Sequence, residues 1–287
     1  CAQRCGLRFE TGNNGQHRRE HRLTTLVIER PYVEIAVTAV QPVDHVAQER
    51  NVLGNRVGVF AIQKALHTAF DMGLSPEQAD AIFGRPLGIP KTGVFGLYDL
   101  IGIDLMSDVA ASLESILPAD DPFQAVATKP PVMVRMIDAG LIGNKGDKGG
   151  FYRPADPARG ISRKTLNFAT LDYRDYEPCK PQAAIDAELS GDFTPLLDLD
   201  DELGAFAWEV LSHTLCYAVS LVPDVNESLV AIDDAMKLGY NWVRGPFEMI
   251  DVIGVDRFGA SAPADVLAEK FGFTAEAVER RLREALA

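Results

Sequence analysis

The feature that most constrains this chain is a short internal repeat. The run GVFGLYDLIGID at residues 93–104 returns as GPFEMIDVIGVD at residues 245–256, with Gly, Phe, Asp, Ile, Gly and Asp at the same steps. Upstream of each run lie the same parts in the same order: a long apolar segment, a short segment with a capping residue, and a loop rich in breakers. A repeat of this kind indicates one structural unit used twice. We therefore predict two tandem copies of one domain.

Hydrophobic spacing predicts that both copies are helical. Apolar residues recur at helical spacing over 54–72, and Gly73 follows where helices end with a left-handed residue. Ser75 and Gln78 have the spacing of a capping box, before a second helix that ends near Gly84. Further helices are predicted over 94–104, 105–117, 131–139, 201–222 and 227–238.

The predicted fold is all-α, with a short irregular or β-like N-terminal remnant. The first fifty residues hold seven Arg, no Lys and six acids, although the whole chain carries a net charge of −13. Within them, LTTLVIERPYVEIAVTAV at residues 23–40 predicts one or two short strands, the only sheet-forming part that we expect. The predicted division is a remnant over 1–52, a first helical domain over 53–155, a linker over 156–198 and a second helical copy over 199–287.

Composition argues against several classes of function. The acidic net charge argues against a nucleic-acid partner. No run of eighteen apolar residues and no export signal occur, so we expect no membrane span and a cytoplasmic location. The cysteines have no metal-ligand spacing, and the pair His17 and His21 has no third ligand at a recognisable interval, so no metal site is expected.

Four motifs in order carry a family resemblance. They are GNRVGVF, the capped helix before a Gly/Pro loop, VFGLYDLIGID, and GNKGDKGGFY. Together they resemble the C-terminal helical domain of NAD-dependent 3-hydroxyacyl-CoA dehydrogenases, and AIDDAMKLGYNWVRGPFEMIDVIGVD resembles the same domain again. The resemblance covers residues 53–287. Tandem copies of this kind are similar to those in long fusion enzymes that also contain an enoyl-CoA hydratase domain.

The resemblance implies an oxidoreductase of fatty-acid β-oxidation. Its reaction is the oxidation of a (3S)-3-hydroxyacyl-CoA to a 3-ketoacyl-CoA with NAD, and it implies an acyl-CoA substrate and a homodimer. The sequence contains neither the GxGxxG turn of a nucleotide-binding unit nor the family's HFFNP-like stretch with its catalytic histidine. We therefore expect a fragment that is inactive alone, with NAD bound mainly by a missing domain.

Asn55 is the candidate catalytic residue. In the family, the asparagine of the matching motif contacts the reacting end of the substrate, beside a His–Glu pair of the nucleotide-binding domain. A side-chain amide offers both donors and an acceptor, so it can hold the 3-hydroxyl and the developing ketone. The alternative is that Asn55 caps the first helix, since asparagine is a favoured N-cap residue.

Lys145 in GNKGDKGGFY is the candidate cofactor-binding residue. In the family, a lysine of this glycine-rich turn reaches across to the cofactor, and a flexible ammonium suits a phosphate or ribose oxygen. This chain has one extra residue before GGFY, so Lys148 competes for the role. The alternative is a tight glycine turn that carries a solvated lysine.

The second copy has no matching asparagine, because the equivalent site falls at Phe206 or Ala207. We expect this copy to be a scaffold that fills the surface which a second subunit's helices would cover in a two-domain homologue. Three basic residues have two interpretations, and four acidic residues have one predicted structural role. The positive residues Arg56, Arg85 and Lys91 either meet CoA phosphates or are ordinary solvated charges. The acids Asp99, Asp104, Asp251 and Asp256 are predicted to cap helices.

A second class of function remains open. A non-catalytic helical dimerisation module also fits a chain without a cofactor domain, and it predicts a dimer that binds neither NAD nor acyl-CoA. Another dehydrogenase in which a helical domain follows a nucleotide-binding unit is a third hypothesis, but it leaves the repeated motif and GNKGDKGGFY unexplained.

Overall fold

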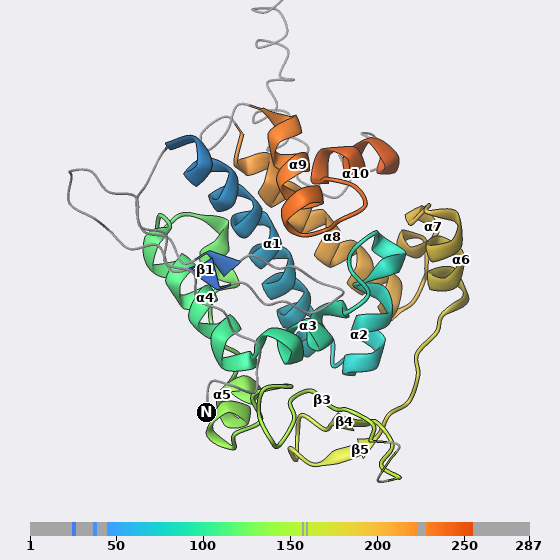
Figure 1. Cartoon of the computed structure of the whole chain (residues 1–287). Coiled ribbons are helices and arrows are strands. Elements are labelled where there is room, and N and C mark those ends of the chain that lie inside the picture. Colours follow the sequence, from blue (N-terminus) through green and yellow to red (C-terminus); the bar gives the residue numbers. More distant parts are fainter. Residues whose placement is uncertain are drawn as a thin grey trace, which may run out of the picture.

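A computed structural model shows a mostly helical protein (Figure 1). It describes residues 45–156, 158, 160–222 and 228–254, and the antiparallel strands β1 (Thr25–Leu26) and β2 (Val37–Thr38). The predicted helical class is confirmed, and so are strands within 23–40. The pair His17 and His21, Asp256 and the rest of the range 255–287 lie outside the described residues. Within the described ranges, no helix has the length and apolar character to cross a membrane.

The first half of the described chain contains five α-helices. They are α1 (His45–Asp71), α2 (Pro76–Ile82), α3 (Gly93–Ile101), α4 (Ile103–Ile116) and α5 (Pro131–Asp138), with 3-10 turns η2 (Arg85–Leu87) and η3 (Pro122–Ala125). Helix α1 begins upstream of its predicted start at residue 54. Gly73 has a φ of +70°, and Ser75 and Gln78 form the predicted capping box, so both local predictions are confirmed.

The second half adds a small sheet and five more helices. They are β3 (Tyr152–Arg153), β4 (Lys164–Leu166), β5 (Tyr173–Asp175), α6 (Gln182–Ser190), α7 (Thr194–Leu197), α8 (Glu202–Ser220), α9 (Leu229–Gly239) and α10 (Pro246–Ile253). The three strands are antiparallel in the order β3-β4-β5. The expectation that strands are confined to the N-terminal segment was therefore wrong. Strands of two or three residues are too short to show the alternation of apolar and polar residues from which strands are predicted.

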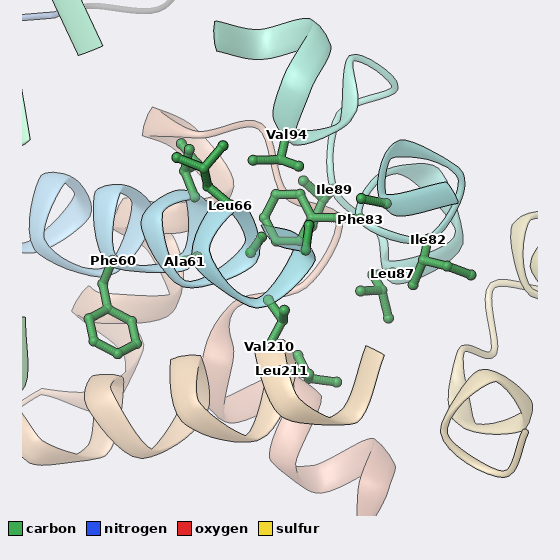
Figure 2. Packing of buried hydrophobic residues seen from close by; sticks show 14 of the residues in the cluster. Phe60, Ala61, Leu66, Ile82, Phe83, Leu87, Ile89, Val94, Val210 and Leu211 are labelled. Carbon is green, nitrogen blue, oxygen red and sulfur yellow. The ribbon is translucent and has the colours of Figure 1, made fainter. Parts of the chain in front are cut away.

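Helix α1 runs through the middle of the molecule and packs on α8 and α9 (Figure 1). It lies antiparallel to α8, because Arg56 meets Tyr217 whereas Lys64, further along α1, meets Glu209, which comes earlier on α8. Small residues of α1, such as Ala61 and Ala65, are fully buried. The large apolar side chains around this contact are those in Figure 2: Phe60 and Leu66 from α1, Ile82 and Phe83 from α2 and its end, and Val210 and Leu211 from α8.

The same carboxylate contact occurs in both halves of the chain. On α2, Asp80 accepts hydrogen bonds from the backbone N–H groups of Phe95 and Gly96, at 2.8 and 3.0 Å, and so caps the start of α3. On α9, Asp233 accepts one from the backbone N–H of Phe247, at 2.8 Å, at the start of α10. Each contact satisfies a backbone donor that the helix itself leaves without a partner.

These contacts explain the glycines of the sequence repeat. A Cβ on Gly93 would lie 2.4 Å from Cγ of Asp80, and a Cβ on Gly245 would lie 2.2 Å from Oδ1 of Asp233. The second glycine of the repeat ends the helix, with a φ of +113° at Gly102 and +84° at Gly254. Two segments that are far apart in sequence therefore share a carboxylate contact at the helix start and a glycine of positive φ after the helix end. The backbone at the two starts differs, since φ is +67° at Gly93 and −75° at Gly245.

Glu77 joins the small sheet to α2. Its buried carboxylate receives two hydrogen bonds from the Arg174 guanidinium, at 2.8 and 2.7 Å, and one from the Thr165 hydroxyl at 2.6 Å. Burial alone would raise the pKa of Glu77, but these donors hold it below its ordinary value. The stretch predicted as a linker over 156–198 is thus bound tightly to the first helical unit.

Asp99 makes a second link, and the prediction that it caps a helix start was wrong. It lies in the last turns of α3 and accepts the backbone N–H groups of Phe151 and Tyr152, at 2.8 and 2.7 Å. The Tyr152 hydroxyl donates in turn to Asp80, at 2.9 Å. Of the other two described acids, Asp104 stands in the first turn of α4 as expected, and Asp251 lies inside α10 rather than at its start.

The buried carboxyl groups of Asp80 and Asp99 are expected to make the fold less stable as pH rises. Burial raises the pKa of Asp80 and of Asp99 to about 7, against the hydrogen bonds that favour ionisation. An unfolded aspartate titrates near about 3.9, so the stability that these groups contribute is full below that value and is lost as pH rises through about 7. We expect the free energy of unfolding to fall between about pH 5 and about pH 8, by at most about 1.4 kcal/mol per pH unit for each carboxyl.

The matched test is urea unfolding of the wild type and of Asp80→Asn across this pH range. The variant should show a shallower fall, because an amide does not titrate. His67, whose pKa is lowered by burial, acts in the opposite direction in both proteins and cancels in the comparison. Equal slopes in the two proteins would show that Asp80 does not titrate in this window.

Candidate functional site

Asn55 lies within α1, well after the helix begins at His45. The alternative that it caps the helix was therefore wrong. Its side chain is half-buried, and its Oδ1 atom accepts a hydrogen bond from the Tyr240 hydroxyl at 3.0 Å. Tyr240 directly follows α9, so the candidate catalytic amide of the first half meets a residue of the second half.

Two glycines of α1 make room for the Tyr240 ring. A Cβ on Gly58 would lie 2.2 Å from Cε1 of Tyr240, and one on Gly54 would lie 3.7 Å from Cε2. Burial raises the pKa of the Tyr240 hydroxyl well above its ordinary value, so it stays protonated and can donate to Asn55. The GNRVG segment is thus a contact surface as well as the start of a sequence motif.

Arg56 fits neither interpretation that the sequence allowed. It is 8% exposed, donates to the Tyr217 hydroxyl at 3.1 Å, and forms an ion pair with Asp121. It is neither a solvated charge nor a group available to a CoA phosphate. Arg85, in contrast, is exposed and pairs with Glu188 at 2.8 Å.

Lys145 lies at the junction of α3 and α4. Its ammonium forms an ion pair with Asp104 at 2.8 Å, and the two side chains are 41% and 40% exposed. The Lys145 side chain passes over Gly102, where a Cβ would lie 2.2 Å from Cε of Lys145. The competing Lys148 instead donates to the backbone carbonyl of Ala139, at the end of α5. Partial burial would raise the pKa of Asp104, but the hydrogen bond from Lys145 holds it below its ordinary value.

The two candidate residues do not meet within this chain. Lys145 pairs with the first turn of α4, whereas Arg56, the neighbour of Asn55, pairs with Asp121 shortly after α4 ends. A helix of this length is about 20 Å long. Figure 1 shows α4 alongside α1 over this span. A site that uses both residues therefore needs a ligand or another domain that reaches along α4.

The positions that replace Asn55 in the second half are apolar and buried. Phe206 and Ala207 lie on α8 and are 0% exposed. Sequence reasoning missed Tyr240 as a partner of Asn55 because 185 positions separate them. The signal that could have pointed to it was the pair of glycines, Gly54 and Gly58, one helical turn apart, which marks a surface that another group approaches closely.

The fold and these contacts define the class: a mostly helical protein in which a half-buried amide on α1 meets the residue that follows α9. Residues 53–153 match the family model described as 3-hydroxyacyl-CoA dehydrogenase, C-terminal domain. This range includes both candidate residues. Over this range the chain is similar to the 3-hydroxyacyl-CoA dehydrogenase family, as the resemblance implied.

Two relatives agree with this family. A protein of Rickettsia prowazekii named as a fatty acid oxidation complex trifunctional enzyme is 38% identical over 200 residues, which is 70% of this chain and 27% of that protein. One of Bacillus subtilis named as a 3-hydroxyacyl-CoA dehydrogenase is 30% identical over 224 residues, 74% of this chain and 28% of that protein. The chain thus spans little more than a quarter of the length of these relatives.

A second family model matches residues 205–274, and its description is Transketolase-like TK C-terminal domain. A transketolase of Staphylococcus epidermidis is 39% identical over 67 residues, 23% of this chain and 10% of that enzyme. The matched interval includes most of α8, all of α9 and α10, and residues outside the described part. No solved structure matches this chain.

The contact between Tyr240 and α1 gives a stability prediction. Gly58→Ala adds a methyl group where the ring lies, and such overpacking costs about 1–3 kcal/mol. Replacing a helical glycine by alanine returns up to about 1 kcal/mol, so we expect a net loss of about 1 kcal/mol in the free energy of unfolding. Chemical denaturation measures it.

Gly239→Ala is the matched control. Gly239 is also helical, in α9, and a Cβ there would have no atom within 4 Å. We expect no loss of stability in this variant. A Gly58→Ala protein as stable as the control would contradict the close packing of Tyr240.

Proposed function

We propose that this chain is the substrate-side part of a 3-hydroxyacyl-CoA dehydrogenase. It binds the acyl-CoA, and Asn55 contacts the oxygen at C3 of the substrate during oxidation of a 3-hydroxyacyl-CoA to a 3-ketoacyl-CoA. The observation that carries the proposal is the family match over residues 53–153, in which the half-buried side chain of Asn55 has its amide oxygen held by Tyr240.

The chemistry assigned to Asn55 is orientation and hydrogen bonding. An amide N–H that points at the C3 oxygen stabilises the negative charge that this oxygen carries while its proton leaves. The amide cannot itself remove that proton, because it has no basic group at neutral pH. The base therefore comes from outside the described residues of this chain, as the family resemblance implies.

NAD is the proposed cofactor, and it supplies the acceptor for the hydride when bound. Lys145 is the residue of this chain that fits its edge, since a flexible ammonium that is 41% exposed can exchange Asp104 for a ribose or phosphate oxygen. The sequence contains no GxGxxG turn, so we propose that another domain holds most of the cofactor.

We propose that the second half is a degenerate copy of the first, used as a scaffold. The shared cap geometry of Asp80 and Asp233 supports this over the described part of the second copy, through Gly254. The transketolase match covers 10% of that enzyme, which is too small a part to carry its activity. The word trifunctional in the name of the Rickettsia prowazekii relative supports a multi-domain fusion, and the enoyl-CoA hydratase domain stays a prediction from the resemblance. Homodimer formation stays a prediction.

The test is calorimetric titration of the chain with acetoacetyl-CoA, a 3-ketoacyl-CoA. We expect the wild type to bind and Asn55→Ala to bind about tenfold more weakly, because a hydrogen bond to the substrate oxygen is lost and a polar group stays unpaired. The control is Lys64→Ala on the same helix, which loses only its ion pair with Glu209 and should bind like the wild type. A wild type without affinity for acetoacetyl-CoA would favour the dimerisation module instead.

A further inference from the structure

We infer that Tyr240, from the second half of the chain, is a positioning residue that fixes the Asn55 amide with its N–H groups turned toward the substrate. This inference rests on the proposed function of Asn55. It gives the second half a part in substrate recognition, beyond that of a scaffold.

The hydrogen bond sets which end of the amide is free. The Tyr240 hydroxyl donates to Oδ1 of Asn55 at 3.0 Å, so the carbonyl end of the amide faces α9. Nδ2, with both of its protons, faces away and makes no hydrogen bond to the residues that the structure describes. An amide held in this way acts as a donor toward a ligand.

The opposite orientation of the amide fits less well. If Nδ2 faced Tyr240, the hydroxyl would accept, and its own proton would need another acceptor. Among the described residues, the Tyr240 hydroxyl has no hydrogen-bond partner other than Asn55, so that acceptor would be missing. Because the pKa of Tyr240 is raised by burial, the hydroxyl also cannot act as an anionic acceptor near neutral pH.

The backbone of α1 is shaped for this contact. Gly58 lies so close to the Tyr240 ring that a Cβ would be 2.2 Å from one ring carbon and 2.3 Å from another. Gly54 lies against Ala235 of α9, where a Cβ would be 3.4 Å from the backbone oxygen. These two glycines lie one helical turn apart on the same face of α1, on either side of Asn55 in the sequence. The packing against them fixes the ring independently of the hydrogen bond to Asn55.

A donor suits the chemistry at C3. The oxygen of the substrate gains negative charge as its proton is removed, and an N–H donor stabilises that charge whereas a carbonyl oxygen would oppose it. Asn55→Asp separates the two cases. The carboxylate keeps an acceptor for Tyr240 and loses the donors, so we expect binding of acetoacetyl-CoA to weaken at least as much as in Asn55→Ala.

The central variant is Tyr240→Phe, which keeps the ring and removes the hydroxyl. We expect it to weaken acetoacetyl-CoA binding by about threefold to tenfold, the effect of one hydrogen bond. Tyr217→Phe is the matched control. Its hydroxyl accepts from Arg56, the next residue on α1, so it removes a neighbouring contact between the halves without touching Asn55. We expect its affinity to equal that of the wild type.

A double-variant cycle distinguishes positioning from general support of the fold. If Tyr240 acts through Asn55, Tyr240→Phe weakens binding in the wild-type background and has no further effect in the Asn55→Ala background. A structural role would weaken binding in both backgrounds and overturn the inference. So would a Tyr240→Phe protein with wild-type affinity, or an Asn55→Asp protein with wild-type affinity. An Asn55→Ala protein with wild-type affinity would overturn the proposed function itself.

Discussion

The close packing of α1 against α8 and α9 is the constraint on which the rest of the structure depends. Helix α1 can occupy the middle of the molecule because small residues line it, with Ala61 facing the core and Gly54 and Gly58 facing α9. Packing at this distance stabilises through many weak contacts and tolerates little change in side-chain volume. It also decides what surrounds Asn55, since the contact of α1 with α9 places Tyr240 beside the Asn55 amide.

Buried carboxylates have structural roles throughout this fold. Asp80 and Asp233 cap helices, Glu77 receives Arg174 and Thr165, and Asp99 holds the backbone after the glycine-rich turn. Buried acids with raised pKa values are often taken as marks of an active site. Here each one accepts backbone or side-chain donors that would otherwise lack a partner, so a perturbed pKa alone does not identify a catalytic group in this protein. Asn55, which does not titrate, is the better candidate.

Local sequence signals predicted the local structure well. The capping box at Ser75 and the left-handed Gly73 need only neighbouring residues to form, and both occur as predicted. The start of α1, the small sheet and the roles of Asp99 and Arg56 were not predicted. The roles of Asp99 and Arg56 depend on partners far along the chain, Tyr152 and Tyr217, and periodicity carries no information about such pairs. The same limit hid Tyr240 from the candidate site.

The positions that the sequence repeat aligns with Asn55 have no polar side chain. Asn55 of the first half faces the hydroxyl of Tyr240, whereas the corresponding positions of the second half, Phe206 and Ala207, are buried among apolar groups. An apolar residue at that position needs no polar partner, and an amide there needs one, because an unpaired buried carbonyl oxygen costs about 1–3 kcal/mol. The hydroxyl that satisfies the amide also leaves its donors free. Helix α1 thus carries the candidate amide, and the residue that follows α9 supplies the hydrogen-bond partner of that amide.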